Sequence, residues 1–239
     1  MVSASSLGRS GRVHKAFCHL YLSFHRLPIE FFFDHFGTFA YVEGLVYEAD
    51  TANERLGGER TPTEAVAELV GYLSRKGLLD ARCRNQLTLA IEYFQFENKL
   101  LSNTGYSLED ATRAASIRSF DFRLLHRIVF QLNSWVYDED MFQRFAVFEE
   151  LMEFDDDCQS CARDERANTF NIVNCLAEHG QEALTSYVGN LVVAVRLAEK
   201  QGGGSFSRLL SRYTEFVPNS ALTTYGNAQL MCESRDVLR

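Results

Sequence analysis

The chain has 239 residues, enough for one large domain or two small ones, and 46% of them are hydrophobic, so a sizeable core can be buried. Its formal net charge of −8 argues against general nucleic-acid binding, which draws most of its affinity from a basic surface. No apolar run approaches the roughly 20 residues of a membrane-spanning helix, and the first residues lack the apolar core of a signal peptide. We therefore expect a cytoplasmic protein that has no membrane span and no nucleic-acid partner.

The N-terminal part of the chain combines a polar start with helical patterns. Residues 1–12 are small and polar, and this composition predicts disorder. Apolar and aromatic side chains recur at helical spacing over residues 13–26, and Pro28 marks a break. The following stretch, residues 29–56, reads as one long helix that ends before two glycines.

The second half of that long helix has an acidic face. Glu43, Tyr47, Asp50 and Glu54 follow one another at spacings that place them on one side of a helix. Asp50 and Glu54 lie about one turn apart, so their carboxylates are candidate ligands for a metal ion.

The next helices have clear starts. Thr61 can cap a helix whose first residue is Pro62. A second helix is expected over about residues 80–101, and Ser107 with Asp110 three residues later predicts the start of a third.

A central helix is predicted over residues 148–173, and one of its faces is acidic. The acidic stripe lacks the interleaved Lys or Arg that normally supports an exposed helix face, and its members are Glu149, Glu153, Asp156, Asp157, Ser160 and Asp164. Crowded carboxylates repel one another unless a cation lies among them. A hard divalent cation such as Mg²⁺ prefers such oxygen ligands, whereas the alternative is an ordinary solvated helix face.

The C-terminal part contains a further helix and a tail. A helix is expected over residues 182–201, closed by a flexible loop at the glycines 202–204. The tail, residues 218–239, has no clear periodicity, so it is either disordered or a lid over a pocket. The expected organisation is thus one all-α domain over residues 13–217, flanked by these two ends.

The stretch D-D-x-x-S-x-x-R-D, from Asp156 to Asp164, resembles the second metal motif of class I terpene synthases, N/D-D-x-x-S/T-x-x-K/R-E. The resemblance implies that Asp156, Ser160 and Asp164 are metal ligands, with Asp157 beside them. It also implies that Arg163 reaches a substrate diphosphate. The last motif position is Asp here rather than Glu, which shortens that side chain by one methylene.

Two other segments are similar to parts of the same family. The D-x-x-x-E of Asp50 and Glu54 looks like a degenerate version of the family's first, aspartate-rich metal motif. Residues 107–118 resemble the segment that carries the arginine sensing the diphosphate, a role that the resemblance gives to Arg113 or Arg118.

Arg212-Tyr213 looks like the Arg-Tyr pair that contacts the diphosphate in this family. The resemblance implies an all-α, single-domain helical bundle of the isoprenoid synthase type with a central cavity. It further implies Mg²⁺ or Mn²⁺ as cofactor and ionisation of an allylic prenyl diphosphate, followed by cyclisation or quenching and release of pyrophosphate. The catalytic residues on this hypothesis are Asp50, Asp156, Arg163, Arg212 and Tyr213.

Two other functions fit the same residues. A prenyltransferase or a squalene/phytoene-like synthase would use the same fold and metals to join the isoprenoid to another acceptor. A non-catalytic helical interaction module would instead present its acidic faces to a partner. Whether the chain forms a homodimer stays open.

Overall fold

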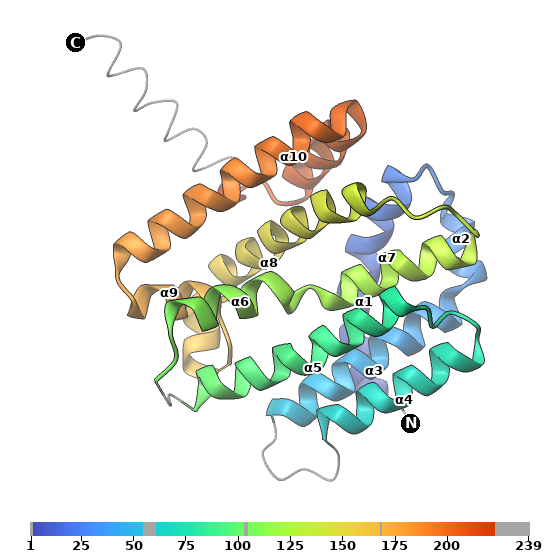
Figure 1. The fold of residues 1–239 in the computed structure, drawn as a ribbon, viewed down its shortest axis with the longest axis horizontal. Helices are drawn as coiled ribbons and strands as arrows, with labels where there is room; N and C mark the ends of the chain where they lie inside the picture. The colour runs from blue at the N-terminus through green and yellow to red at the C-terminus, as the bar shows by residue number, and fades with distance from the viewer. Residues whose placement is uncertain (1, 55–60, 103–104, 168, 223–239) are drawn as a thin grey trace. The chain divides into compact units, whose positions relative to one another are not determined.

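The computed structural model describes residues 2–54, 61–102, 105–167 and 169–222. Every regular element in these ranges is helical and none is a strand, which confirms the predicted all-α class (Figure 1). Within the same ranges, no helix is long and apolar enough to cross a membrane. The chain divides into two compact units, Met1–Glu139 (unit 1) and Asp140–Arg239 (unit 2), where the sequence predicts a single domain.

The chain is helical almost from its start. Helix α1 spans Ala4–Phe17 and continues into a π-helical turn, η1, at Cys18–Leu22. Its cap is Ser3, whose hydroxyl accepts a hydrogen bond from the backbone N–H of Ser6. Residues 1–12 are predicted to be disordered because they are small and polar. The structure differs because α1 packs along helix α3, a tertiary contact that composition does not reveal.

The long helix predicted over residues 29–56 is two helices. Helix α2 spans Ile29–Asp34 and α3 spans Phe36–Glu54, separated by His35, which leaves helical geometry at φ −112° and ψ 9°. The last two residues of the prediction lie outside the described ranges. Helix α3 buries Phe39 and Val42, and it also buries Glu43 of the predicted acidic face. The other two acids of that face differ, since Asp50 is half-buried and Glu54 is exposed.

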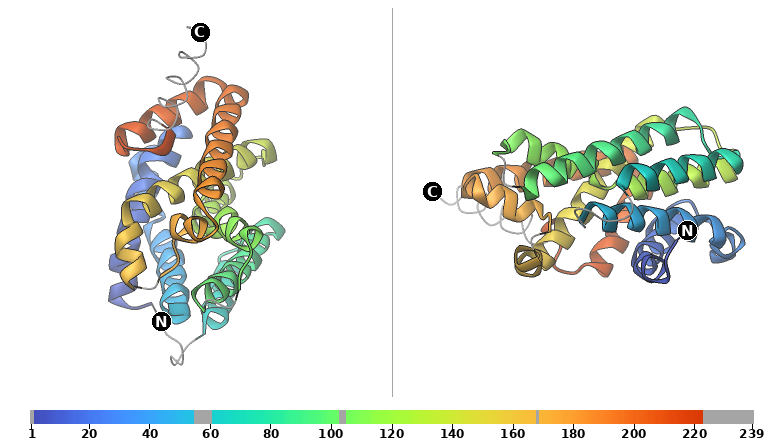
Figure 2. Two further views of the ribbon diagram at one scale, coloured as in Figure 1. Left: turned by 90° about the vertical axis from the view of Figure 1, so that its left-hand side faces the viewer. Right: turned by 90° about the horizontal axis from the view of Figure 1, so that it is seen from below.

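The remaining described helices of unit 1 are α4 (Pro62–Arg75), α5 (Ala81–Leu101), α6 (Leu108–Arg118) and α7 (Phe120–Leu132). Thr61 and Ser107 cap α4 and α6, as the sequence predicts, and Asp80 caps α5. Each of the three side chains accepts a hydrogen bond from a backbone N–H of the first turn. Helix α4 packs between α3 and α5, and α5 also packs against α6 and α7. Figure 2 shows α4 and α5 running side by side.

In the described part of unit 2 the main helices are α8 (Glu139–Ala167), which starts at the last residue of unit 1, α9 (Ile172–Glu178) and α10 (Gln181–Phe216). The predicted central helix therefore begins earlier than residue 148 and ends before residue 173. The sequence predicts that a helix ends at residue 201 before the three glycines, and the structure has a break there, since α10 consists of two helical segments that meet at a kink. Gly203 kinks it there, with a φ of 61° that a residue without a side chain adopts at no steric cost.

Candidate functional site

Three motif residues of α8 meet at the carboxylate of Asp164. The Ser160 hydroxyl donates a hydrogen bond to its Oδ2, and the Arg163 Nε donates to its Oδ1 at 3.1 Å. The amide of Asn171, which precedes α9, donates to the same Oδ2 at 3.0 Å. Burial acts to raise the pKa of Asp164, but the hydrogen bonds from Ser160, Asn171 and Arg163 outweigh it and lower the pKa. Asp164 is therefore an anion at neutral pH.

Asp157 holds the start of α9. Its side chain is fully buried, and its Oδ2 accepts a hydrogen bond from the backbone N–H of Ile172 at 2.7 Å. Asn171 caps the same helix, since its Oδ1 accepts from the N–H groups of Val173 and Asn174 at 3.0 and 3.3 Å. The amide of Asn171 also donates to the backbone carbonyl of Asp157 at 2.9 Å. Asp157 and Asn171 thus satisfy donors that the end of a helix leaves without partners.

The acidic stripe of the sequence is therefore split in the structure. Asp157, Ser160 and Asp164 are buried against the start of α9, whereas Asp156 is exposed. The repulsion expected among these carboxylates is relieved at Asp157 and Asp164 by hydrogen-bond donors from the chain. Sequence reasoning missed Asn171, although an Asn directly before an apolar run is a typical helix start.

The two residues of the predicted Arg212-Tyr213 pair lie in different surroundings. Arg212 is exposed, whereas Tyr213 is buried and its hydroxyl donates to Asp155 Oδ2 at 2.6 Å. Asp155 Oδ1 accepts a second hydrogen bond, from the backbone N–H of Ala221 at 2.7 Å. Burial raises the pKa of Asp155, and the donors Ala221, Ser220 and Tyr213 oppose that rise. Asp155 of α8 thus binds both Tyr213 of α10 and Ala221 of the tail, and the tail beyond residue 222 lies outside the described ranges.

In unit 1, the predicted ligand Asp50 has a cation from the chain itself. Arg9 of α1 donates to Asp50 Oδ2 at 2.6 Å and to the Thr51 hydroxyl at 3.1 Å. The same guanidinium lies over the ring of Tyr47, 4.5 Å from its centroid. Glu54, the other predicted ligand, is exposed at the last residue of α3. A metal ion at Asp50 would therefore compete with Arg9.

A buried carboxyl that the sequence analysis missed lies near Asp50. Glu97 of α5 accepts hydrogen bonds from the Asn53 amide at 2.5 Å and the Tyr93 hydroxyl at 3.1 Å. Burial, followed by the negative charge of Asp50, raises its pKa to about 7. The signal in the sequence is a Glu within the aromatic stretch Y-F-Q-F-E of a helix whose neighbouring positions are apolar.

The two candidate diphosphate sensors have different surroundings. Arg113 is exposed and holds Glu92 by two hydrogen bonds, at 2.8 and 3.1 Å. Arg118 is half-buried, and its positive charge acts to lower the pKa of Glu97. Of the two, Arg118 therefore belongs to the polar cluster that contains Asp50.

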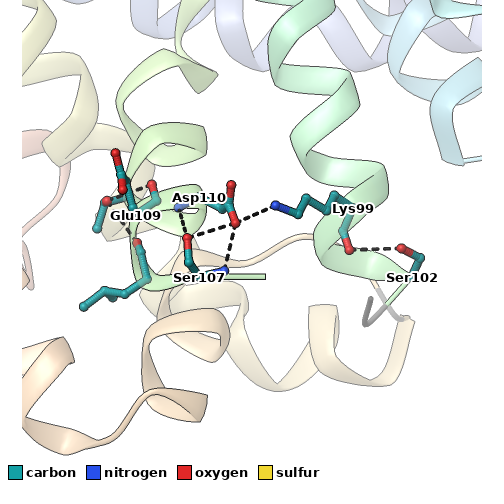
Figure 3. Close-up of polar contacts among 7 residues, drawn as sticks. Lys99, Ser102, Ser107, Glu109 and Asp110 are labelled. Atoms are coloured by element: carbon teal, nitrogen blue, oxygen red, sulfur yellow. Dashed lines mark hydrogen bonds and ion pairs between the residues drawn. The ribbon is translucent and has the colours of Figure 1, made fainter. Parts of the chain in front are cut away.

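Arg113 also lines an open pocket of about 500 Å³ at the start of α6. The polar groups there bind one another, as Figure 3 shows: Lys99 lies 2.6 Å from Asp110, which also accepts from the backbone and hydroxyl of Ser107. The Lys99 hydrogen bond, followed by those from Ser107, lowers the pKa of Asp110 to about 2. The positive charges beside this pocket are thus already paired with carboxylates.

The predicted metal ligands are oxygen donors, and they fit a hard divalent cation in part. Ser160 and the anionic Asp164 lie together, but Asp156 is exposed and Asp157 is engaged with α9. Within the described ranges, no group of three or more His, Cys, Asp or Glu side chains is arranged to hold a metal ion. Asp50 and Glu54 belong to unit 1 and the other predicted ligands to unit 2, so their combination in one metal site stays a prediction.

Comparison with known proteins adds no relative, since no family model, no curated protein and no solved structure matches this chain.

Proposed function

We propose that this chain is a class I terpene synthase-like enzyme that ionises an allylic prenyl diphosphate. The observation that carries the proposal is the contact of Ser160, Arg163 and Asp164 on α8. Ser160 and Arg163 match the motif by type and spacing, and Asp164 occupies its last position with Asp in place of Glu. The three residues meet at one carboxylate that is ionised at neutral pH. The all-helical architecture supports the proposal at the level of fold class only.

The residues of α8 have separable roles in this proposal. Ser160 and Asp164 would hold Mg²⁺ or Mn²⁺, with Asp156 and the substrate phosphates completing the ion's ligands. The bound ion would neutralise negative charge on the departing diphosphate. Arg163 is suited to donate hydrogen bonds to the departing diphosphate, because its side chain is 65% exposed. Only its Nε is used in the hydrogen bond to Asp164.

The resemblance implies that both Arg212 and Tyr213 contact the diphosphate, whereas the proposal gives this role to Arg212 alone. Tyr213 is engaged with Asp155 and would have to leave that hydrogen bond to contact a diphosphate. Arg212, being exposed, remains the candidate of the pair for a diphosphate contact. In unit 1, the corresponding candidates are Arg118 and Asp50.

The test is incubation with geranyl, farnesyl or geranylgeranyl diphosphate, with and without EDTA, measuring released pyrophosphate and extractable product. We expect release from at least one substrate, and only when the divalent cation is present. A second isoprenoid in the same assay separates a cyclase from a prenyltransferase or a squalene/phytoene-like synthase. Release that persists in EDTA would contradict the proposal.

Asp164→Glu and Asp164→Asn together separate a metal-binding role from a structural one. Asp164→Glu restores the family's usual residue and keeps the charge, so a metal ligand should retain turnover in this variant. Asp164→Asn keeps the size but loses the charge and should abolish turnover. Equal activity in the two variants would show that the carboxylate only anchors α9.

A second candidate function, a non-catalytic helical interaction module, is favoured by one observation. Asp157 and Asp164 both hold the start of α9, which is a sufficient structural reason for their presence. Mg²⁺ with pyrophosphate separates the two functions, because a ligand bound only by the folded state must raise the melting temperature. No shift, together with no release from any substrate, would favour the interaction module.

A further inference from the structure

Two histidines from separate elements of unit 1 meet at their ring nitrogens. His25 follows the π-helical turn η1, and His126 lies in the middle of α7. Their Nε2 atoms are 2.6 Å apart, which is a hydrogen-bond distance. His126 is 0% exposed and His25 is half-buried. The contact joins residues 101 positions apart in the chain, and the proposed function uses neither of them.

Aromatic rings lie against both histidines. The ring of His25 is 5.1 Å from that of Trp135 and 5.4 Å from that of Phe130, measured between centroids. The ring of His126 is 4.9 Å from that of Tyr21 and 5.5 Å from that of Phe130. These neighbours replace water around the imidazoles, and a charged imidazole therefore loses hydration there.

The surroundings favour the neutral form of both rings. Burial lowers the pKa of His25 from 6.5 to about 4. Burial is also the largest cause that lowers the pKa of His126 well below its ordinary value, and the positive charges of His25 and Arg127 add to it. The titratable side chains that the structure shows against the pair are Arg127 of α7 and Tyr21 of η1. At pH 7 the pair is therefore uncharged.

The geometry of the pair allows it only a limited number of protons. Between two facing Nε2 atoms, one ring donates its N–H and the other accepts through its lone pair. The accepting ring has no proton at that nitrogen. If both rings are fully protonated, two N–H groups and two positive charges face each other in an apolar environment. The contact therefore breaks when the second proton binds.

The turn that carries His25 has a strained backbone. Arg26, the next residue, has a φ of 56°, which is uncommon for a residue other than glycine. It lies where the helical segment ends, since the N–H of Leu27 donates to the carbonyl of Leu22 at 2.8 Å. A strained conformation persists only while surrounding contacts hold it. The contact between His25 and His126 is one that acid can remove.

We propose that His25 and His126 form an acid-opened contact, which holds the turn at residues 23–28 on α7 at neutral pH and releases it when both rings are protonated. The device lies in unit 1, whereas Ser160, Arg163 and Asp164 belong to unit 2. Its test therefore does not depend on the proposed function.

The direction of the pH dependence follows from the lowered pKa values. The unfolded chain takes up protons at His25 and His126 from about pH 6.5 downwards, but the folded chain does not. The contribution of the pair to stability is thus complete above pH 6.5 and is lost as the pH falls towards 4. Glu97 has the opposite effect over part of this range, so variants are compared with the wild-type chain at each pH.

The first test is a pH titration of the full wild-type chain. The ¹⁵N chemical shifts of the imidazole rings report the protonation of each histidine, and the emission of Trp135, the single tryptophan, reports on the ring beside His25. We expect both rings to be neutral at pH 6.5 and the emission to change as they take up protons below about pH 5. Unshifted titration of the two rings would overturn the proposal, and so would unchanged emission while they titrate.

The second test uses His25→Gln, which can still bond to His126 Nε2 but cannot become charged. The melting temperature of the wild-type chain should fall between pH 7 and pH 5 by about 4 °C more than that of His25→Gln. The change in Trp135 emission should be absent from this variant. His179→Gln, which removes an exposed histidine from unit 2, is the control and should behave as the wild-type chain. Equal falls in wild-type and His25→Gln would overturn the proposal. If His25→Gln does not fold, the titration of the wild-type chain decides the question.

Discussion

Buried carboxyls in the two units of this protein have opposite surroundings. In unit 2, two buried carboxyls of α8 accept hydrogen bonds from the chain. Asp157 accepts one from the backbone N–H of Ile172. Asp164 accepts hydrogen bonds from the side chains of Ser160, Asn171 and Arg163. In unit 1, Glu43 has no donor among the described residues, and Glu97 has two neutral donors and the charge of Asp50 nearby.

The difference shows that burial alone does not decide whether an acidic residue is structural or functional. A carboxylate that accepts hydrogen bonds from the backbone or a positive charge is stabilised in its charged form. One that lacks such donors favours protonation or a cation. The sequence pattern points first to α8 as the site of unbalanced charge, but in the structure the least satisfied acid is Glu43.

The largest expected effect concerns Glu97. Its pKa rises from 4.5 to about 7 on folding, so the folded state binds a proton more tightly than the unfolded state does. Stability should therefore be highest below pH 4.5 as far as this group is concerned, and it should fall as the pH rises through 7. Glu97→Gln should remove this pH dependence and stabilise the protein at pH 8 by roughly 3 kcal/mol.

Urea unfolding between pH 5 and pH 8 measures this effect. The Gln side chain can still accept from Asn53 and donate to the Tyr93 hydroxyl, so packing is preserved. Glu109→Gln is the control and should leave the pH dependence as it is. If Glu97→Gln is less stable than the wild-type chain at pH 8, the buried carboxyl of Glu97 is stabilised in its charged form, as those of unit 2 are, and the predicted difference between the units is wrong.

The next effect compares two neighbouring aspartates on α8. Asp157→Asn should destabilise the protein by about 2 kcal/mol, because it weakens a charged hydrogen bond to the buried N–H of Ile172. Asp156→Asn removes the same charge one residue earlier, at an exposed position, and should change stability by less than about 0.5 kcal/mol. Chemical unfolding at pH 7 measures both variants. Equal effects would mean that Asp157 does not anchor α9.

The smallest effect concerns Tyr213 and Asp155. Tyr213→Phe removes one donor from a buried carboxyl and should cost about 1 kcal/mol at neutral pH. The pKa of Asp155 should rise further in this variant, so the loss should be larger at pH 8 than at pH 4. Tyr187→Phe, which removes a less buried hydroxyl that donates to Glu150, is the control. A loss that does not depend on pH would show that Asp155 is uncharged throughout this range.

Local sequence signals predict the helix starts in this protein well, and long-range features poorly. The caps at Thr61, Asp80 and Ser107 act on backbone groups within three residues, so their effect can be read from the sequence alone. The helix at Ala4–Phe17 packs along α3, a contact that its local sequence does not reveal. Both this helix and the split of residues 29–56 at His35 differ from the prediction.

The sequence by itself determined the all-α class, the capped helix starts and the acidic character of α3 and α8, because helical periodicity and capping act over a few residues. Only the tertiary structure decided which acids are satisfied. Asp157 depends on Asn171 and Ile172, and Asp164 on Asn171, after a chain reversal beyond the end of α8. Glu43 has no donor among the described residues, and burial, followed by the negative charge of Asp121, raises its pKa. Helical spacing places a carboxylate on a face, but the donors that meet it come from other elements.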